Sequence, residues 1–360
     1  MAVPVQSISF WQKLKKHKGA LFGIIVIGCA FLLAVFAYVI VPDRSPYANR
    51  MIVEIEGRKP GFSQLFLKLK KEAVPETGFF QFLLHGREDS YIYVPVTGYR
   101  VENGMVIINR YIDEGVTDTM IIPANTLAAP VSSHFVRSYY WLGTDKYGRD
   151  ILSRLVIGTR VSLGVGLIAI IISLTIGVVL GSLAGYYGGW IDSGVMWLVN
   201  VVWSIPTLLL VFAITLLLGK GFWQVFVAVG LTMWVSVARL VRGQVLVARQ
   251  LEWAEAARAL GFTDGRILFR HILPNILGPV FVLAASNFAS AIIIEAGLSF
   301  LGVGVQPPQP SWGLMIKENY NFIITANPVL ALAPGFAVMM LVLAFNLLGN
   351  GLRDALDVRE

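Results

Sequence analysis

The sequence contains few residue types capable of catalysis or metal binding, and they are spread apart. Its four histidines, at positions 17, 85, 134 and 271, are distant from one another, and its single cysteine is Cys29. It contains no His-Glu-x-x-His zinc motif, no Gly-x-Ser-x-Gly nucleophile motif and no Gly-x4-Gly-Lys-Ser/Thr phosphate loop. We therefore expect no catalytic residue and no metal site, and we expect any ATP hydrolysis to occur on another chain.

A polar segment between two long apolar runs carries the most informative spacing. Residues 251–260 are rich in Ala, Leu, Glu and Arg, which favour a helix, and Gly261 is suited to end it in a left-handed conformation. Asp264 can cap a second short helix over residues 265–271. Pro274 cannot continue that helix and is expected to mark where the chain turns back into the next apolar run. Taken alone, the segment is equally compatible with an ordinary solvated loop.

The composition is that of a polytopic membrane protein. Of the 360 residues, 56% are hydrophobic and 14% are charged, whereas about 25% of the residues in a soluble domain are charged. The net charge of +7 arises beside apolar runs, where Lys and Arg set orientation in a membrane, so nucleic acid is not the expected partner.

Six apolar runs are near the length of about 20 residues that crosses a bilayer. They cover residues 19–41, 161–187, 196–218, 222–238, 277–298 and 329–348. Pro206 is expected to kink the third run. The last five runs form a predicted helical core over residues 161–350, and Gly177, Gly181 and Gly185 form a stripe suited to close helix packing.

The lysine-rich residues 1–18 predict a cytoplasmic N-terminus. A secretory signal has an apolar stretch of only about 7–15 residues, which is shorter than the 19–41 run, and that run also continues past a loose lipoprotein-like box at Val26–Cys29. Six spans then place the 351–360 tail in the cytoplasm. The polar loop over residues 239–276 has six arginines and three acids, which independently indicates the cytoplasmic side.

Residues 42–140 predict a small β-rich insert outside the cytoplasmic membrane. Strands are expected at Met51–Ile55 and Tyr91–Val94, and the Asn103-Gly104 dipeptide predicts a hairpin over Gly98–Tyr111. We interpret this insert as a spacer or docking surface.

Residues 141–160 predict an amphipathic helix at the membrane interface. Asp145 with Arg149, and Asp150 with Arg154, have i,i+4 spacing. On an exposed helix such pairs contribute only about 0.2–0.5 kcal/mol each.

Polar side chains inside apolar runs are the remaining candidates for function, because they are costly in lipid. The densest group lies on the fifth run and contains Ser286, Asn287, Ser290 and Glu295. These four residues predict either that this face of the helix lines a translocation pathway, or that their side chains form hydrogen bonds to neighbouring helices.

Three stretches together carry a family resemblance. They are Leu142-Gly143-Thr144-Asp145 with Gly148-Arg149-Asp150; Glu255-Ala256-Ala257 with Gly261 and His271-Ile272-Leu273-Pro274-Asn275; and Glu295-Ala296-Gly297-Leu298-Ser299 with Pro310-Ser311-Trp312-Gly313. They resemble the motifs of ABC-importer permeases of the oligopeptide, dipeptide and nickel family, and most of all its C-type subunit. The resemblance covers residues 141–350 and, more loosely, the first span. The 42–140 insert is longer than that family leads us to expect.

The resemblance implies a type I ABC importer permease fold: an all-α protein with six transmembrane helices in the bacterial inner membrane. It implies that the chain forms half of a pathway for di- or oligopeptides. The implied partners are a second, similar permease, two cytoplasmic P-loop ATPases that hold ATP and Mg, and an extracytoplasmic substrate-binding protein. The implied ATPase-coupling residues are Glu255, Ala256, Ala257, Gly261, Leu273 and Pro274.

Three alternatives remain open at the level of sequence. Near relatives in the same family handle nickel or other small solutes. A stand-alone channel would need no ATPase-docking segment. An intramembrane enzyme would need a Ser-Lys pair or two aspartates at helical spacing within the spans, and no such pair is present.

Overall fold

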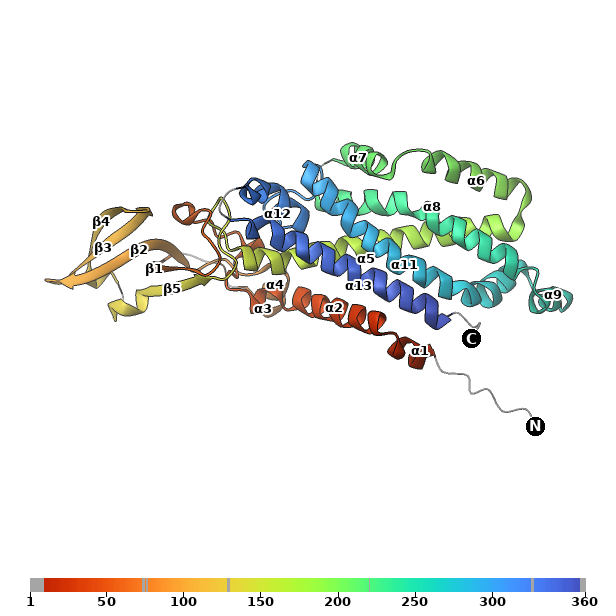
Figure 1. Ribbon diagram of the computed structural model, residues 1–360, viewed down its shortest axis with the longest axis horizontal. Helices are drawn as coiled ribbons and strands as arrows, with labels where there is room; N and C mark the ends of the chain where they lie inside the picture. The colour runs from red at the N-terminus through yellow and green to blue at the C-terminus, as the bar shows by residue number, and fades with distance from the viewer. Residues whose placement is uncertain are drawn as a thin grey trace. The chain divides into compact units, whose positions relative to one another are not determined.

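The computed structural model describes residues 10–72, 75, 77–127, 130–219, 221–324 and 327–356 (Figure 1). The predictions for residues 1–9 and 357–360 therefore lie outside the described residues. The chain divides into two units. Unit 1 comprises Met1–Phe31, Ser162–Gln306 and Ala337–Glu360, and unit 2 comprises Leu32–Val161 and Pro307–Phe336.

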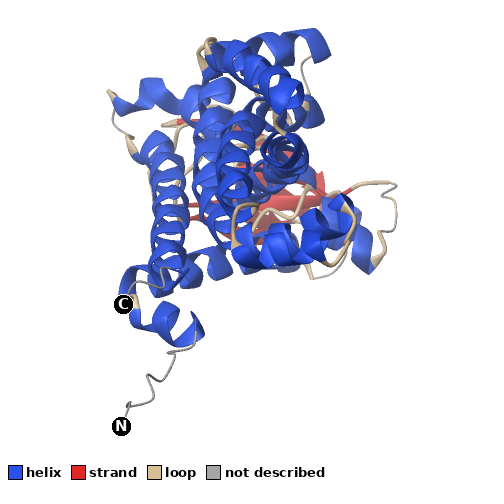
Figure 2. Cartoon of the chain, turned by 90° about the vertical axis from the view of Figure 1, so that its right-hand side faces the viewer, coloured by secondary structure: helices blue, strands red, loops and turns tan. Residues whose placement is uncertain are grey.

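Figure 2 shows the described chain as mostly helix with one sheet. The α-helices are α1 (Phe10–Lys16), α2 (Lys18–Val35), α3 (Ala37–Ile40), α4 (Phe79–His85), α5 (Ile151–Tyr187), α6 (Gly189–Trp203), α7 (Thr207–Leu218), α8 (Phe222–Ala248), α9 (Glu252–Ala259), α10 (Asp264–Arg266), α11 (Leu273–Leu301), α12 (Trp312–Asn319) and α13 (Val329–Leu356). The strands are β1 (Phe62–Lys70), β2 (Tyr91–Glu102), β3 (Met105–Asp113), β4 (Val116–Pro123) and β5 (Phe135–Tyr140).

Within the described residues, five helices are long and apolar enough to cross a membrane, and a sixth span results if the bent pair α6 and α7 counts as one. The predicted kink at Pro206 is in fact a complete break, since α6 ends at Trp203, α7 begins at Thr207 and the two helices are bent by 92°. Pro206 has no N–H to donate and stands as the N-cap of α7, so the helix restarts there.

The glycine stripe on α5 packs against α8 within unit 1, as predicted. A Cβ added at Gly177 would lie 2.5 Å from the Cβ of Val237, and one added at Gly181 would lie 2.4 Å from the carbonyl oxygen of Ala238. At Gly185 the nearest atom is the carbonyl oxygen of Arg242, at 2.8 Å. The missing side chains therefore let two helix backbones come into close contact.

The predicted β-rich insert is confirmed in unit 2 as a five-stranded antiparallel sheet with the order β4-β3-β2-β1-β5. The Asn-Gly hairpin is correct: Glu102 pairs with Met105, and Asn103 and Gly104 have φ values of +50° and +75°. The strand predicted at Met51–Ile55 is wrong, because Val53–Ile55 forms a 3-10 turn.

The sheet buries apolar side chains on both faces. Phe66 and Leu67 are adjacent on β1 and therefore point to opposite faces. Leu67 belongs to a cluster with Val96, Val106, Ile108 and Leu127, and Phe66 to one with Ile52, Ile55 and Tyr140. The 3-10 turn at Val53–Ile55 thus covers one face of the sheet.

Candidate functional site

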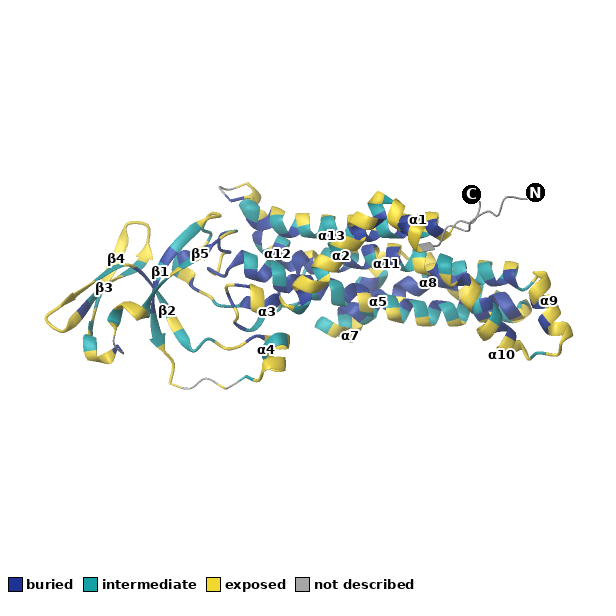
Figure 3. Ribbon diagram, turned by 90° about the horizontal axis from the view of Figure 1, so that it is seen from below, coloured by how far each residue is buried: buried dark blue, intermediate teal, exposed yellow. Residues whose placement is uncertain are grey.

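The polar segment of unit 1 forms a compact structure that we call the coupling element, residues Glu252–Ile272. Its first helix, α9, buries one side only: Ala254 and Ala257 are buried, while Glu255, Ala256 and Arg258 are exposed (Figure 3). The buried side is made of alanine, so α9 can lie close to its support without a bulky side chain between them. Glu255 is exposed on the outer side, and Arg258 lies over the Tyr186 ring with its Nη2 donating to the Arg249 carbonyl at 3.3 Å.

The end of α9 is fixed by its backbone. Gly261 has a φ of +77°, as predicted. The Gly261 N–H donates to the Arg258 carbonyl at 2.9 Å, and the Phe262 N–H donates to the Ala257 carbonyl at 3.2 Å. These two bonds form a Schellman motif, and Phe262 and Ala257 belong to the same apolar cluster, which is the contact that usually accompanies this motif.

The path after this turn differs from the prediction in two ways. Thr263, rather than Asp264, is the N-cap residue of α10. Pro274 does not end a helix: α10, a π-helix over Ile267–Ile272 and α11 run on as one helix, Asp264–Leu301. Pro274 directly follows the π-helix, where the Leu273 N–H donates to the Leu268 carbonyl, and this wider i→i−5 turn accommodates a residue that has no N–H.

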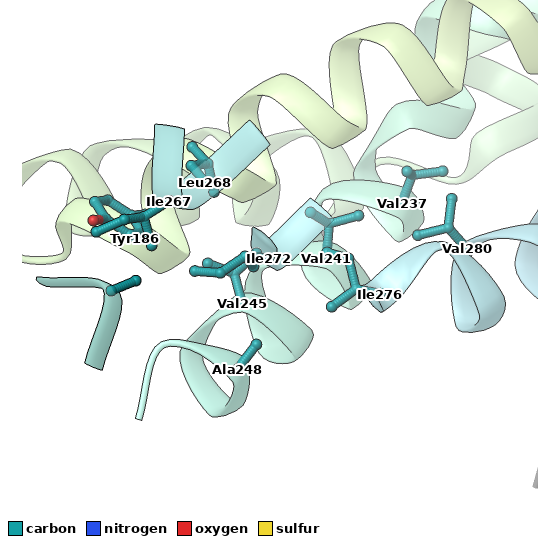
Figure 4. Close-up of a cluster of buried hydrophobic side chains, with 11 residues drawn as sticks. Tyr186, Val237, Val241, Val245, Ala248, Ile267, Leu268, Ile272, Ile276 and Val280 are labelled. Atoms are coloured by element: carbon teal, nitrogen blue, oxygen red, sulfur yellow. The ribbon is translucent and has the colours of Figure 1, made fainter. Parts of the chain in front are cut away.

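An apolar cluster anchors the coupling element to the long helices of unit 1. Figure 4 shows Val241 and Val245 of α8 gathered with Ile272 at the end of the π-helix and Ile276 at the start of α11. The same cluster contains Ala257 of α9. The side chain of α9 that faces inward is therefore part of the same packed core as α8 and α11.

Polar contacts reinforce this anchorage at the end of α5. The Tyr186 hydroxyl donates to Asp264 Oδ1 at 2.7 Å, and Arg249 Nη1 donates to the Tyr186 carbonyl at 2.9 Å. Phe262 stacks on the His271 ring, and the Arg266 guanidinium lies 4.1 Å from the centre of the Phe262 ring. The coupling element is thus fixed to α5 as well as to α8 and α11.

The exposed side of the coupling element includes two large apolar residues that the sequence analysis missed. Leu260 is 73% exposed and Phe269 is 69% exposed. Both occur among charged residues, and this pattern could have indicated a contact surface. Of the six predicted coupling residues, Glu255, Ala256, Gly261 and Pro274 are exposed, Ala257 is buried and Leu273 is partly buried.

The structure separates the four polar residues of α11 into two pairs. Asn287 and Glu295 are buried. Asn287 Nδ2 lies 3.4 Å from Ser236 Oγ on α8. Ser299 Oγ donates to Glu295 Oε1 at 2.6 Å and accepts from the Val305 N–H at 3.0 Å, so Glu295 helps to hold the turn that follows α11.

The second pair, Ser286 and Ser290, is exposed along one side of α11. Ser286 lines a cavity of about 620 Å³ in unit 1, together with residues of α6, α8 and α13. The pathway role of all four residues stays a prediction, and the cavity supports it for Ser286.

The interfacial helix predicted over residues 141–160 is wrong. Residues 141–150 form turns, and α5 begins at Ile151 and includes the rest. Gly143 and Gly148 have φ values of +82° and +70°, which interrupt any helix there. Asp at the first position and Gly at the fourth position are typical of a type I turn, so the turn at Asp145–Gly148 could have been predicted from the sequence.

Three charged residues of this segment, Asp145, Arg149 and Arg154, are buried within unit 2. Together with Glu318, whose side chain is 9% exposed, they form what we call the ionic cluster. Arg149 donates from Nε to Asp145 Oδ2 at 2.6 Å and from Nη2 to Glu318 Oε2 at 2.8 Å. Arg154 lies 3.6 Å from Glu318 and 4.0 Å from Asp145. The surface pairs predicted from spacing are thus replaced by a buried network.

Asp150 does not pair with Arg154 as the spacing predicted. It accepts hydrogen bonds from the backbone N–H and the hydroxyl of Ser153. Burial of the carboxyl raises the pKa of Asp150, and the bonds from Ser153 oppose that shift. Asp150 therefore acts as a cap at the start of α5.

Comparison with known proteins identifies the class. Residues 177–360 match the family described as binding-protein-dependent transport system inner membrane component, and residues 6–52 match the N-terminal TM domain of oligopeptide transport permease C. The chain belongs to this family, the membrane subunits of ABC importers, and the predicted fold class and permease identity are confirmed. It is a multi-pass inner membrane protein.

Two relatives have names that specify a substrate. The glutathione transport system permease protein GsiD of Pectobacterium atrosepticum is 46% identical over 220 residues, which cover 61% of this chain and 73% of the relative. The dipeptide transport system permease protein DppC of Alkalihalophilus pseudofirmus is 43% identical over 235 residues, which cover 65% of this chain and 75% of the relative. A solved structure of the MetNI methionine ABC transporter has a TM-score of 0.47 and 21% identity, covering 56% of this chain and 96% of its own.

Proposed function

We propose that the chain is one of two permease subunits of an ATP-driven importer for di- or oligopeptides. Membership of an ABC importer family implies a partner permease and an ATPase. The finer composition that we propose is a second, similar permease, two cytoplasmic ATPase chains that bind ATP and Mg, and an extracytoplasmic binding protein that delivers the peptide. The chain itself acts as a transport subunit and not as an enzyme, and both of its termini face the cytoplasm.

The peptide class rests on the relatives, whose names specify glutathione and dipeptides. Glutathione is itself a tripeptide, so both names describe short peptides with free carboxylates. Nickel or another small solute is the alternative within the family, and the names of the two relatives favour the peptide class.

The coupling element carries the mechanism. It presents Glu255, Leu260 and Phe269 outward, while Ala257 packs against the cluster of α8 and α11. When ATP closes the two ATPase chains, their movement displaces α9, and the packed cluster transmits this displacement to the spans. Alternating access then follows from reorientation of the spans around a pathway near the midplane.

Purification from the native membrane in a mild detergent, followed by mass spectrometry and reconstitution, tests the assignment. We expect a second permease and P-loop ATPases to copurify, and we expect the reconstituted complex with its binding protein to accumulate a dipeptide only with ATP and Mg. Recovery of the chain alone, or uptake without ATP, would contradict the proposal.

A further inference from the structure

The cavity beside Ser286 contains an unusual pair of cations. Its wall includes Arg239 of α8 and Arg353 of α13, together with the hydroxyl-bearing Ser236 and Ser286 and the indole of Trp203. The remaining wall is apolar, with Pro279 and leucines among its residues. All of these residues belong to unit 1.

The Arg239 guanidinium is held in place without a carboxylate. It lies 3.5 Å from the centre of the Trp203 ring, and its Nη2 donates to Asn200 Oδ1 at 3.1 Å. Its Nε is buried and has no hydrogen-bond partner among the described residues. Stacking on an aromatic ring and one amide contact orient the group, and neither contact neutralises its charge.

The second cation, Arg353, is exposed at the end of α13. Arg353 stands in the last turn of α13, and no salt bridge joins it or Arg239 to an acid in the part of the chain that the structure describes. Arg242 of the same helix α8, by contrast, forms a two-pronged ion pair with Asp192. Arg239, unlike Arg242, is thus a half-buried cation whose contacts among the described residues are an aromatic ring and an amide, so it is available to an anion from outside the chain.

We infer that this cavity is a binding site for the free carboxylate of a transported peptide, in which Arg239 and Arg353 receive the anion. The inference rests on the proposed function, because it takes the peptide as the occupant. The volume of about 620 Å³ falls in the range of roughly 300–1,000 Å³ that is typical of small-molecule sites. The planar guanidinium of Arg239 suits two-point recognition of a carboxylate, and the apolar wall suits the side chains of a short peptide.

A cysteine-protection experiment on the complete transporter tests this site. Cys29 is the only cysteine of this chain, so a Cys29→Ser background with Ser286→Cys reports on the cavity wall. The complex in nanodiscs is treated with a maleimide, with and without Ala-Ala or its C-terminal amide. Ser290→Cys is the matched control, since Ser290 is exposed on the same helix one turn further on and does not line the cavity.

We expect Ala-Ala to slow the labelling of the Ser286→Cys variant roughly tenfold when the peptide is present at ten times its Kd. The amide should protect far less, and neither compound should protect the Ser290→Cys variant. Arg239→Gln and Arg353→Gln should each remove the protection by Ala-Ala while leaving the labelling rate without peptide unchanged. Arg270→Gln, which changes an exposed arginine outside the cavity, should keep the protection.

Several results would overturn the inference. Equal protection by the acid and the amide would show that the carboxylate is not recognised. Protection by phosphatidylglycerol in the disc, compared with phosphatidylcholine alone, and no further effect of Ala-Ala would identify a lipid headgroup site. A Ser286→Cys variant whose thiol does not react even without peptide would mean that a partner subunit covers the cavity. Dipeptide uptake measured in parallel separates the two proposals: uptake without protection rejects this site alone, whereas absence of ATP-driven uptake rejects the proposed function.

Discussion

The coupling element and the ionic cluster use charged residues in opposite ways. In α9 of the coupling element Glu255 and Arg258 are exposed, and the buried residues are Ala254 and Ala257. In the ionic cluster Arg149 and Arg154 are among the largest fully buried side chains of the described chain. The comparison teaches that charged residues at similar spacing can have opposite environments: those of α9 stay at the surface, and those of the ionic cluster form a network inside unit 2.

The largest expected effect comes from breaking the ionic cluster. Arg149→Met leaves Asp145 and Glu318 buried without their closest cation. Removing one partner of a buried ion pair costs about 3–5 kcal/mol. We expect a loss of folded subunit or a large fall in the free energy of unfolding in detergent. Arg137→Met, at an exposed position of β5, should change this free energy by less than about 0.5 kcal/mol. Equal behaviour of the two variants would show that the cluster does not stabilise unit 2.

Gly148 and Gly261, which both have a positive φ, allow the packing beside the ionic cluster to be compared with that at the coupling element. A Cβ on Gly148 would lie 1.8 Å from the Ile52 carbonyl oxygen, whereas one on Gly261 would meet nothing within 4 Å. Gly148→Ala therefore combines steric overlap, about 1–3 kcal/mol or more, with backbone strain. Gly261→Ala carries only the strain, about 1–2 kcal/mol. Thermal unfolding of both variants measures the difference, and a larger loss for Gly261→Ala would contradict the packing seen here.

Overpacking beneath α9 should have an intermediate effect. Ala257 is 5% exposed and touches the cluster of α8 and α11, while its neighbour Ala256 is exposed. Ala257→Leu should cost about 1–3 kcal/mol and shift α9 outward. Ala256→Leu is the matched control for stability, with an expected change below about 0.5 kcal/mol. Unfolding of the assembled complex is the measurement, and equal stabilities would show that α9 does not pack as described.

The smallest effect is expected at the end of α5. Tyr186→Phe removes the hydroxyl that donates to Asp264 at 2.7 Å and leaves the ring in the apolar cluster. A single hydrogen bond contributes about 0.5–1.5 kcal/mol. We expect faster hydrogen exchange in α10 and the π-helix, with little change in α8. Unchanged exchange in α10 would mean that this bond does not hold the coupling element.

Local chemistry explains what the sequence could predict. The Asn103-Gly104 hairpin, the Gly261 cap and the Gly177, Gly181 and Gly185 stripe were all found because each depends on residues close together in the chain. The broken third span and the continuous helix through Pro274 were not found, because a proline leaves several backbone outcomes open.

The failures at the ionic cluster and the cavity have a different cause. Arg149 pairs with Glu318, which lies 169 residues away, and no local pattern contains that contact. The i,i+4 spacing of Asp145 and Arg149 is shared by a surface helix and by the observed turn. Similarly, Arg239 and Arg353 line one cavity from two different helices. Tertiary packing brings these distant residues together, and the local spacing of residues in the sequence does not predict such contacts.

The central claim is that the coupling element transmits ATPase movement to the spans, and Gly261→Glu tests it most directly. Gly115→Glu in the β-insert is a matched control, since Gly115 also has a left-handed φ, +79°, and open space around its Cβ. Dipeptide uptake and ATP hydrolysis would be measured together in proteoliposomes that contain the complete transporter. We predict that Gly261→Glu assembles in the membrane but loses uptake relative to ATP hydrolysed, while Gly115→Glu transports normally. Normal coupled uptake by Gly261→Glu would contradict the account.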